Sequence, residues 1–204
     1  MEVIFLKFVI ILMVIKMIDE LQLTVQTSLN FEELEQALLN KGLKKISEKH
    51  QRDFFMLKND EELEFLADFE KLSRSIIIRD LENEFKGYLY KKSNYDLLTA
   101  SYKKSSIKVD VLDLEQAYQF LVALGYFKYF ELNQNLIEYA NAQNKICVSI
   151  IEKLGVFVEI HGTHENYHNG DTPEELKRIL DSFVPNIMNN NYYVNKPLLM
   201  INKI

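Results

Sequence analysis

The sequence predicts an α+β fold with one mainly antiparallel sheet built from two related halves. Three observations support this class. About eight short runs have strand character and several alternate polar with apolar residues, which is typical of sheets with one dry and one polar face. These strands cluster around a few helices instead of alternating with them. The signals that begin and end two of the helices recur 83 positions apart, as an internal duplication would leave them.

The first helix is predicted to begin after Asn30, because Asn30 and Glu33 have capping-box spacing, and to stop at Gly42. The second repeats this pattern, with Asp113 as the cap and Gly125 as the stop. A third helix follows Thr172, with proline in its first turn, and should run to about Phe183.

The predicted strands lie between these helices. A charged helical insertion is expected at 61–72, and a polar loop at 189–191 before a last short strand. The eight strand-like runs are Glu20–Thr27, Gln51–Leu57, Ser75–Arg79, Tyr88–Lys91, Ile107–Leu112, Ile137–Tyr139, Lys145–Ile151 and Val156–His161.

The composition is that of one globular domain: 204 residues, 48% hydrophobic and 26% charged. A net charge of −6 argues against nonspecific binding to nucleic acid or to an anionic membrane, so a small-molecule partner is expected. Cys147 is the single cysteine, flanked by apolar residues, and is interpreted as a small buried hydrophobe in a reducing cytoplasm.

Residues 1–16 are assigned to an apolar N-terminal extension and residues 17–204 to the folded domain. The run Val3–Ile15 is shorter than the roughly 20 residues of a membrane span, and no signal-peptide cleavage site follows it. Two interpretations stay open, a weak membrane anchor or translation starting at Met13 or Met17.

The segment Ile146–Ile160 resembles the late signature of the CYTH superfamily, a strand followed by a turn and L-G-x-F-V-E-I-E. This superfamily holds class IV adenylyl cyclases, thiamine triphosphatases and inorganic triphosphatases. Other family features follow in the expected order, including the Gln-x-Asp-aromatic-aromatic strand at Gln51–Phe55. The resemblance extends from about Ile18 to the end of the chain.

The resemblance implies an eight-stranded antiparallel barrel with helices packed outside and a polar tunnel within. In such a tunnel, basic residues bind a polyphosphate and carboxylates hold Mg²⁺ or Mn²⁺. Mapped onto this sequence, the phosphate-binding candidates are Arg79, Lys91 and Lys104, and the metal-binding candidates are Glu20, Glu159 and His161.

The sequence departs from the family at several charged positions, so its tunnel is interpreted as degenerate. His161, His164 and His168 offer imidazoles that a replacement metal could use, although they lie in a polar turn. The substituted family positions are Gln22 and Thr24 in the first strand, Ile77 in the Arg-x-Arg strand, Gln134 and Leu136 in place of Lys-x-Arg, Ser149 in place of Asp, and His161 in place of the final Glu.

Three functional hypotheses follow. The first is a tunnel protein that binds a nucleotide or other organic polyphosphate with weak or no catalysis. The second is an active adenylyl cyclase or triphosphatase that uses a divalent metal, so enzymatic activity stays open. The third is a protein-interaction domain without a ligand; a homodimer is compatible with all three.

Overall fold

The structure, a computed structural model, describes residues 21–60, 63–82, 86–93, 105–111, 113–163 and 167–203, with the backbone alone at 86, 88, 90–93 and 105–108. The apolar extension 1–16 lies outside these residues. None of the described helices is long and apolar enough to cross a lipid bilayer.

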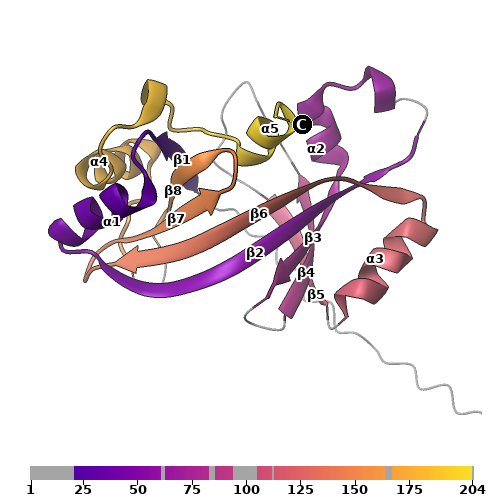
Figure 1. The fold of residues 1–204 in the computed structure, drawn as a ribbon, viewed down its shortest axis with the longest axis horizontal. Helices are drawn as coiled ribbons and strands as arrows, with labels where there is room; N and C mark the ends of the chain where they lie inside the picture. The colour runs from indigo at the N-terminus through magenta and orange to yellow at the C-terminus, as the bar shows by residue number, and fades with distance from the viewer. Residues whose placement is uncertain are drawn as a thin grey trace, which may run out of the picture.

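Within the described residues, eight strands form a single antiparallel sheet, and five α-helices flank it (Figure 1). The strands are β1 (Gln22–Thr27), β2 (Lys44–Lys58), β3 (Ile76–Leu81), β4 (Lys86–Ser93), β5 (Ser105–Val111), β6 (Tyr126–Ala140), β7 (Lys145–Ile151) and β8 (Gly155–His161). The helices are α1 (Phe31–Asn40), α2 (Asp68–Arg74), α3 (Leu114–Ala123), α4 (Pro173–Phe183) and α5 (Lys196–Ile201), with 3₁₀ turns η1 (Leu63–Phe65) and η2 (Met188–Asn190).

The strand order confirms the predicted duplication. It reads β1-β8-β7-β6-β2-β3-β4-β5. If β1 is exchanged with β5, β2 with β6, β3 with β7 and β4 with β8, the same order is obtained in reverse. The two 15-residue strands β2 and β6 run side by side through the middle, with α1 and α4 at one end and α3 at the other (Figure 1). Each half lends its first strand to the edge of the other half.

The duplicated helix signals are confirmed in detail. The side chain of Asn30 accepts the Glu33 amide in a complete capping box, and Asp113 accepts the Gln116 amide at the start of α3. Gly42 and Gly125 follow the two helices with φ angles of +83° and +86°, a conformation that costs residues with a Cβ energy. The sequence therefore specifies both helix ends locally.

One face of the sheet holds the helices over its apolar parts, and it also carries the Arg52–Asp80 ion pair (2.7 Å), which lies on the same side as Met56 and Ile78. Residues directly opposite each other in a ladder point to the same side, so Leu23, Ile160 and Ile146 share a face. On this face α1 and α4 pack over β1, β8, β7 and the end of β6, while α3 packs over β2 and β3 through Leu121. Both duplicated helices therefore lie on the same side of the sheet, as predicted.

The opposite face carries the buried polar side chains of the candidate site, and α5 lies against it. Phe55, Phe157 and Ile151 from the strands pack there with Leu72 of α2 and with the apolar residues of α5. This cluster closes one part of the polar face, and the remainder holds the charged residues described below.

The α+β class and the eight antiparallel strands are confirmed, whereas closure into a barrel is not. In the described part of the chain β1 and β5 are the two sheet edges, with no pairing between them. Part of the outer edge of β1 is instead occupied by the C-terminal segment: the Thr24 amide donates to the Tyr192 carbonyl (3.1 Å) and the Val194 amide donates to the Thr24 carbonyl (3.0 Å).

Two local predictions need correction. The short strand expected after 189–191 is a single bridge between Thr24 and Tyr193, after which the chain forms α5. The predicted limits Gln51–Leu57 and Ile137–Tyr139 are too short, because β2 and β6 stabilise each other along their full length.

Candidate functional site

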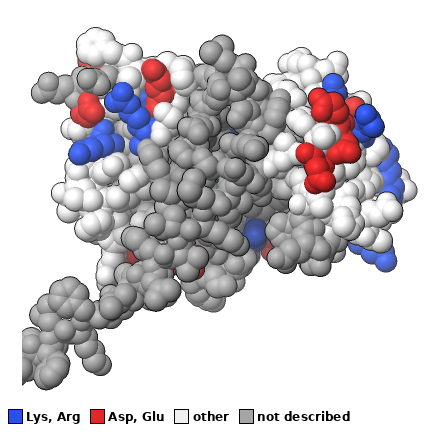
Figure 2. Space-filling view, turned by 180° about the vertical axis from the view of Figure 1, so that it is seen from behind, with Lys and Arg blue, Asp and Glu red and all other residues white. Residues whose placement is uncertain are grey.

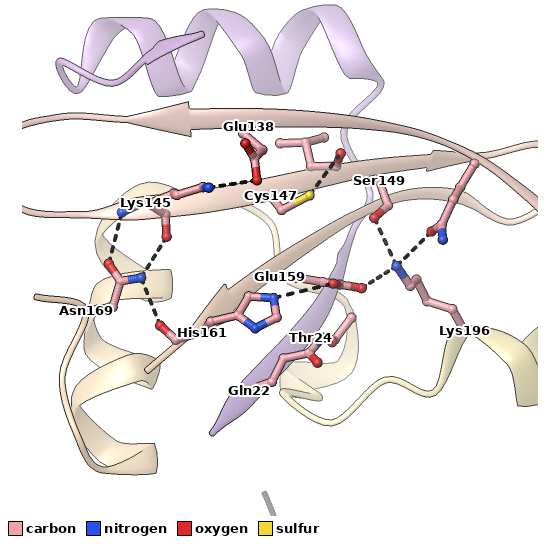
Figure 3. A network of polar contacts seen from close by, with 12 residues as sticks. Gln22, Thr24, Glu138, Lys145, Cys147, Ser149, Glu159, His161, Asn169 and Lys196 are labelled. Carbon is pink, nitrogen blue, oxygen red and sulfur yellow. Dashed lines mark hydrogen bonds and ion pairs between the residues drawn. The ribbon is translucent and has the colours of Figure 1, made fainter. Parts of the chain in front are cut away.

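The centre of the polar face is a buried lysine delivered by α5. Helix α5 begins at Lys196 because Asn195 caps it, accepting the Leu198 amide (3.1 Å), and Pro197 favours the first turn. This placement puts the Lys196 ammonium over β6, β7 and β8 (Figure 3). The residue is only 9% exposed.

Three acceptors surround that ammonium. Lys196 Nζ donates to Gln134 Oε1 (2.9 Å) and to Ser149 Oγ (3.0 Å), and it forms an ion pair with Glu159 Oε1. An ammonium group has three N–H donors, so these contacts match its capacity. Its positive charge is compensated by one carboxylate.

Glu159 lies beside Thr24 of β1, Cys147 of β7 and His161 of β8. It stands between Thr24 and Cys147 in the sheet register, and Gln22 Nε2 donates to Thr24 Oγ1 (3.1 Å). The second carboxylate oxygen of Glu159 is 3.9 Å from His161 Nε2. Burial, and secondarily Glu159, raises the pKa of the Cys147 thiol to about 12, so this cysteine is a neutral thiol. It is half-buried on the polar face opposite Glu159 and not part of the apolar core, which corrects the prediction of a small buried hydrophobe.

A second ion pair lies on β2 and β3. Arg79 Nε donates to Asp53 Oδ1 and Arg79 Nη2 donates to Asp53 Oδ2, both at 2.6 Å. Gln51 Nε2 adds a donor to Asp53 Oδ2 at 3.1 Å. The Asp53 side chain is 4% exposed and that of Arg79 is 21% exposed, so the pair is largely withdrawn from solvent. This fork geometry fixes the guanidinium orientation.

Two glutamines connect the ion pairs into one polar row. Gln51 contacts Asp53, Gln134 contacts Lys196, and the register places Gln51 directly opposite Gln134. The row therefore runs from Glu159 and Lys196 through the two glutamines to Asp53 and Arg79. Its two cations and two carboxylates compensate each other.

The duplication relates the positions in one half of this row to those in the other. The offset of 83 maps Gln51 onto Gln134, the pair at the centre of the row, and maps Asp53 onto Leu136. Asp53 is opposite Arg79 and Leu136 is opposite Ser149, so Ser149 is the second-half equivalent of Arg79. Lys196 donates to that serine. Helix α5 thus supplies a cation beside the strand position that is equivalent to Arg79.

The predicted site residues have different outcomes. Glu159 and His161 lie together, and Arg79 lies on the same face at the other end of the row. Lys91 is opposite Ile76 in the β3–β4 ladder, whereas Arg79 is opposite Tyr88; the Lys91 side chain is not described. Glu20 and Lys104 lie outside the described residues.

The histidine-rich turn is organised by Asn169. Its amide nitrogen donates to the carbonyls of Lys145 (2.8 Å) and His161 (2.9 Å), and its oxygen accepts the Lys145 amide (3.0 Å). The His168 amide donates to the Gln143 carbonyl. His164 lies outside the described residues. The part of the chain that the structure describes has no group of three or more His, Cys, Asp or Glu side chains that could hold a metal ion.

Lys196 was missed at the sequence level. The segment Asn195–Pro197 carries a helix-start signal, with an asparagine cap and a proline in the first turn, and this signal could have identified α5. No local pattern, however, indicates that the first residue of this helix lies over β7 and β8.

Comparisons with known proteins agree with this fold. No protein-family model matches the sequence, and no curated protein matches it significantly. The solved structures of similar fold include the PH1012 protein of Pyrococcus horikoshii, with 18% identity and a TM-score of 0.65 over 88% of this chain and 98% of the other.

Two further structures carry functional descriptions. One is a Hippeastrum adenylyl cyclase candidate described as having a dominant triphosphatase activity, with 13% identity and a TM-score of 0.60 over 90% of this chain and 95% of the other. The other is an adenylate cyclase candidate of Bacillus halodurans, with 14% identity and a TM-score of 0.55 over 89% and 96%. The chain therefore shares its fold with these three proteins, which agrees with the resemblance found at Ile146–Ile160.

Proposed function

We propose that this protein binds a nucleotide or another organic polyphosphate on the polar face of its sheet, with weak or no turnover. The observation that carries the proposal is the buried polar row, in which Arg79 and Lys196 hold two cations at fixed positions on one face. Charge-assisted hydrogen bonds from such groups are the usual means of binding phosphate oxygens. The same face would line a tunnel if the sheet closes around the ligand.

The charge balance of the row argues for modest affinity. Each cation is already paired with a carboxylate, so an incoming phosphate must share or displace Asp53 and Glu159. Ion-pair exchange in a poorly solvated site yields less free energy than binding to an unpaired cation. We therefore expect dissociation constants in the micromolar-to-millimolar range, about −8 to −4 kcal/mol.

The surface supports a small ligand instead of an extended polyanion. In the view from behind, described basic and acidic side chains lie beside one another in mixed groups (Figure 2). The two paired cations that we assign to phosphate are instead partly or fully buried on the sheet. We expect the ligand to be met in the cytoplasm.

Weak turnover is proposed from the neighbours of Glu159. Gln22 and Thr24, which replace charged residues of the family signature, contact each other beside this carboxylate. Removing one strong electrostatic contact commonly costs about 10²–10³ in rate, so several substitutions together favour binding without efficient chemistry.

Calorimetric titration of ATP and of tripolyphosphate, paired with phosphate-release and cyclic-nucleotide assays on the same preparation, tests the proposal. We expect binding, little product, and at least tenfold weaker binding in Arg79→Met and Lys196→Met. Lys203→Met is the matched control, because Lys203 is an exposed lysine just after the same helix. Unchanged affinity in both site variants would refute the assignment.

One alternative is favoured by a specific observation. The Hippeastrum structure of the same fold is described as having a dominant triphosphatase activity, which favours an active triphosphatase as the alternative function. Ordinary turnover that Glu159→Gln abolishes would support this alternative. If the protein shows no binding and no turnover, the remaining hypothesis is a protein-interaction domain without a ligand.

A further inference from the structure

We infer that the Lys196 ammonium takes the place of a divalent cation at Glu159, so that this carboxylate binds no Mg²⁺ or Mn²⁺. The inference deepens the proposed function and rests on it for its relevance to a polyphosphate. Its starting point is the contact geometry around a lysine that sequence analysis did not assign to the site (Figure 3).

The ammonium has the environment that a bound cation would have. It touches one carboxylate, one amide oxygen and one hydroxyl oxygen, contributed by Glu159, Gln134 and Ser149 from three adjacent strands. Oxygen ligands of this kind are those that Mg²⁺ and Mn²⁺ prefer. Here the oxygens converge on a nitrogen that the chain supplies itself.

A divalent ion does not fit beside this lysine. Any ion that binds Glu159 must lie close to the Lys196 ammonium, and like charges repel strongly where solvent is largely excluded. The flanking positions in register, Thr24 and Cys147, carry no carboxylate to offset that repulsion. The high pKa of the Cys147 thiol also disfavours a thiolate ligand.

The duplication points in the same direction. Lys196 donates to Ser149, the equivalent of Arg79, so each half of the sheet has one cation and one carboxylate in contact. In the first half the cation is plainly a side chain and not a metal. The second half reaches the same arrangement by a different route, through α5.

Binding of Mn²⁺ alone, followed by electron paramagnetic resonance of the free ion, tests the inference without any polyphosphate. We expect Glu159→Gln to leave the Mn²⁺ affinity of the full chain unchanged within about twofold, because the ammonium already occupies the carboxylate. We expect Lys196→Met to bind Mn²⁺ at least tenfold more tightly, and Lys196→Met combined with Glu159→Gln to lose that gain. Lys203→Met should behave as the wild type.

Wild-type binding of Mn²⁺ that Glu159→Gln weakens tenfold or more would overturn the inference. If Lys196→Met does not fold, this comparison of wild type with Glu159→Gln still decides. A companion titration of tripolyphosphate, in EDTA and with added metal, separates the two proposals. If tripolyphosphate binds under neither condition, the proposed function is refuted. The Mn²⁺ measurements test the role of Lys196 independently of that result.

Discussion

Replacing Lys196 by methionine should destabilise the protein in a pH-dependent way. The two side chains of the ion pair are 10% and 14% exposed, so the substitution removes the ammonium from beside a largely buried carboxylate, Glu159. The cost is limited, because the carboxyl can bind a proton instead. For a glutamate with an unfolded pKa near 4.3, protonation costs about 4 kcal/mol at pH 7 and about 1 kcal/mol at pH 5.

The sign follows from proton linkage. In the variant the folded state favours the protonated carboxyl, whereas the unfolded state ionises above about pH 4.3. The loss of stability therefore grows as pH rises from 5 to 7, by up to about 3 kcal/mol. A second part of the stability loss, of about 1–3 kcal/mol, does not depend on pH. It arises because the Gln134 and Ser149 side chains lose the ammonium that donates to them.

Urea unfolding of wild type and Lys196→Met at pH 5 and pH 7 measures both parts. Combining Lys196→Met with Glu159→Gln removes the ionisable partner, so the pH-dependent part should disappear in the double variant. A penalty of equal size at both pH values, or one below about 0.5 kcal/mol at pH 7, would refute the reasoning, since a buried pair that loses one partner typically costs more.

Three further outcomes are expected. Arg79→Met should lower the free energy of unfolding by about 3–5 kcal/mol in urea, because Asp53 is 4% exposed and loses a bidentate partner; a loss below 1 kcal/mol would contradict this. Gly42→Ala and Gly125→Ala should each lower the free energy of unfolding by about 1–2 kcal/mol, measured by calorimetry. The two losses should be nearly equal, because an added Cβ meets no non-neighbouring atom within 4 Å at either position and the cost is that of the positive φ alone. Cys147 should resist Ellman's reagent at pH 8 until the protein is unfolded, because burial raises its pKa to about 12, and rapid reaction of the native thiol would disprove that.

Local signals explain most of the fold that the sequence predicts. The limits of α4 at Pro173 and Phe183 agree with the expectation, because a capping box and a following proline define them within a few residues. The repeat of Gly42 and Gly125 identified the duplication for the same reason. Features of this kind do not depend on distant partners.

The ends of the long strands could not be predicted in that way. The segment Lys44–His50 is polar and largely exposed, and it is a strand because the antiparallel ladder with β6 holds it. The edge of β1 is likewise paired with residues near Tyr193, about 170 positions later in the chain. Such pairings depend on tertiary structure, which a local pattern does not contain.

The candidate site shows the same division. Arg79 and Glu159 were identified because they lie in strands with a recognisable signature, and both are on the polar face. Lys196 belongs to a short helix with no periodic pattern of its own. Its importance comes from where the chain returns after α4, which is a property of the whole fold.

This return changes how the loss of strand charges should be interpreted. The resemblance implies positive charges at Gln134 and Leu136, and among the described strand positions the one equivalent to Arg79 is Ser149, which is not a cation. The folded face nevertheless holds one, because α5 brings Lys196 to Ser149. The charge of the site therefore cannot be counted from the strand residues alone. Each half has one cation paired with one carboxylate, although the sequences of the two halves differ. On the proposed function, we therefore expect this face to hold a polyphosphate better than it cleaves one.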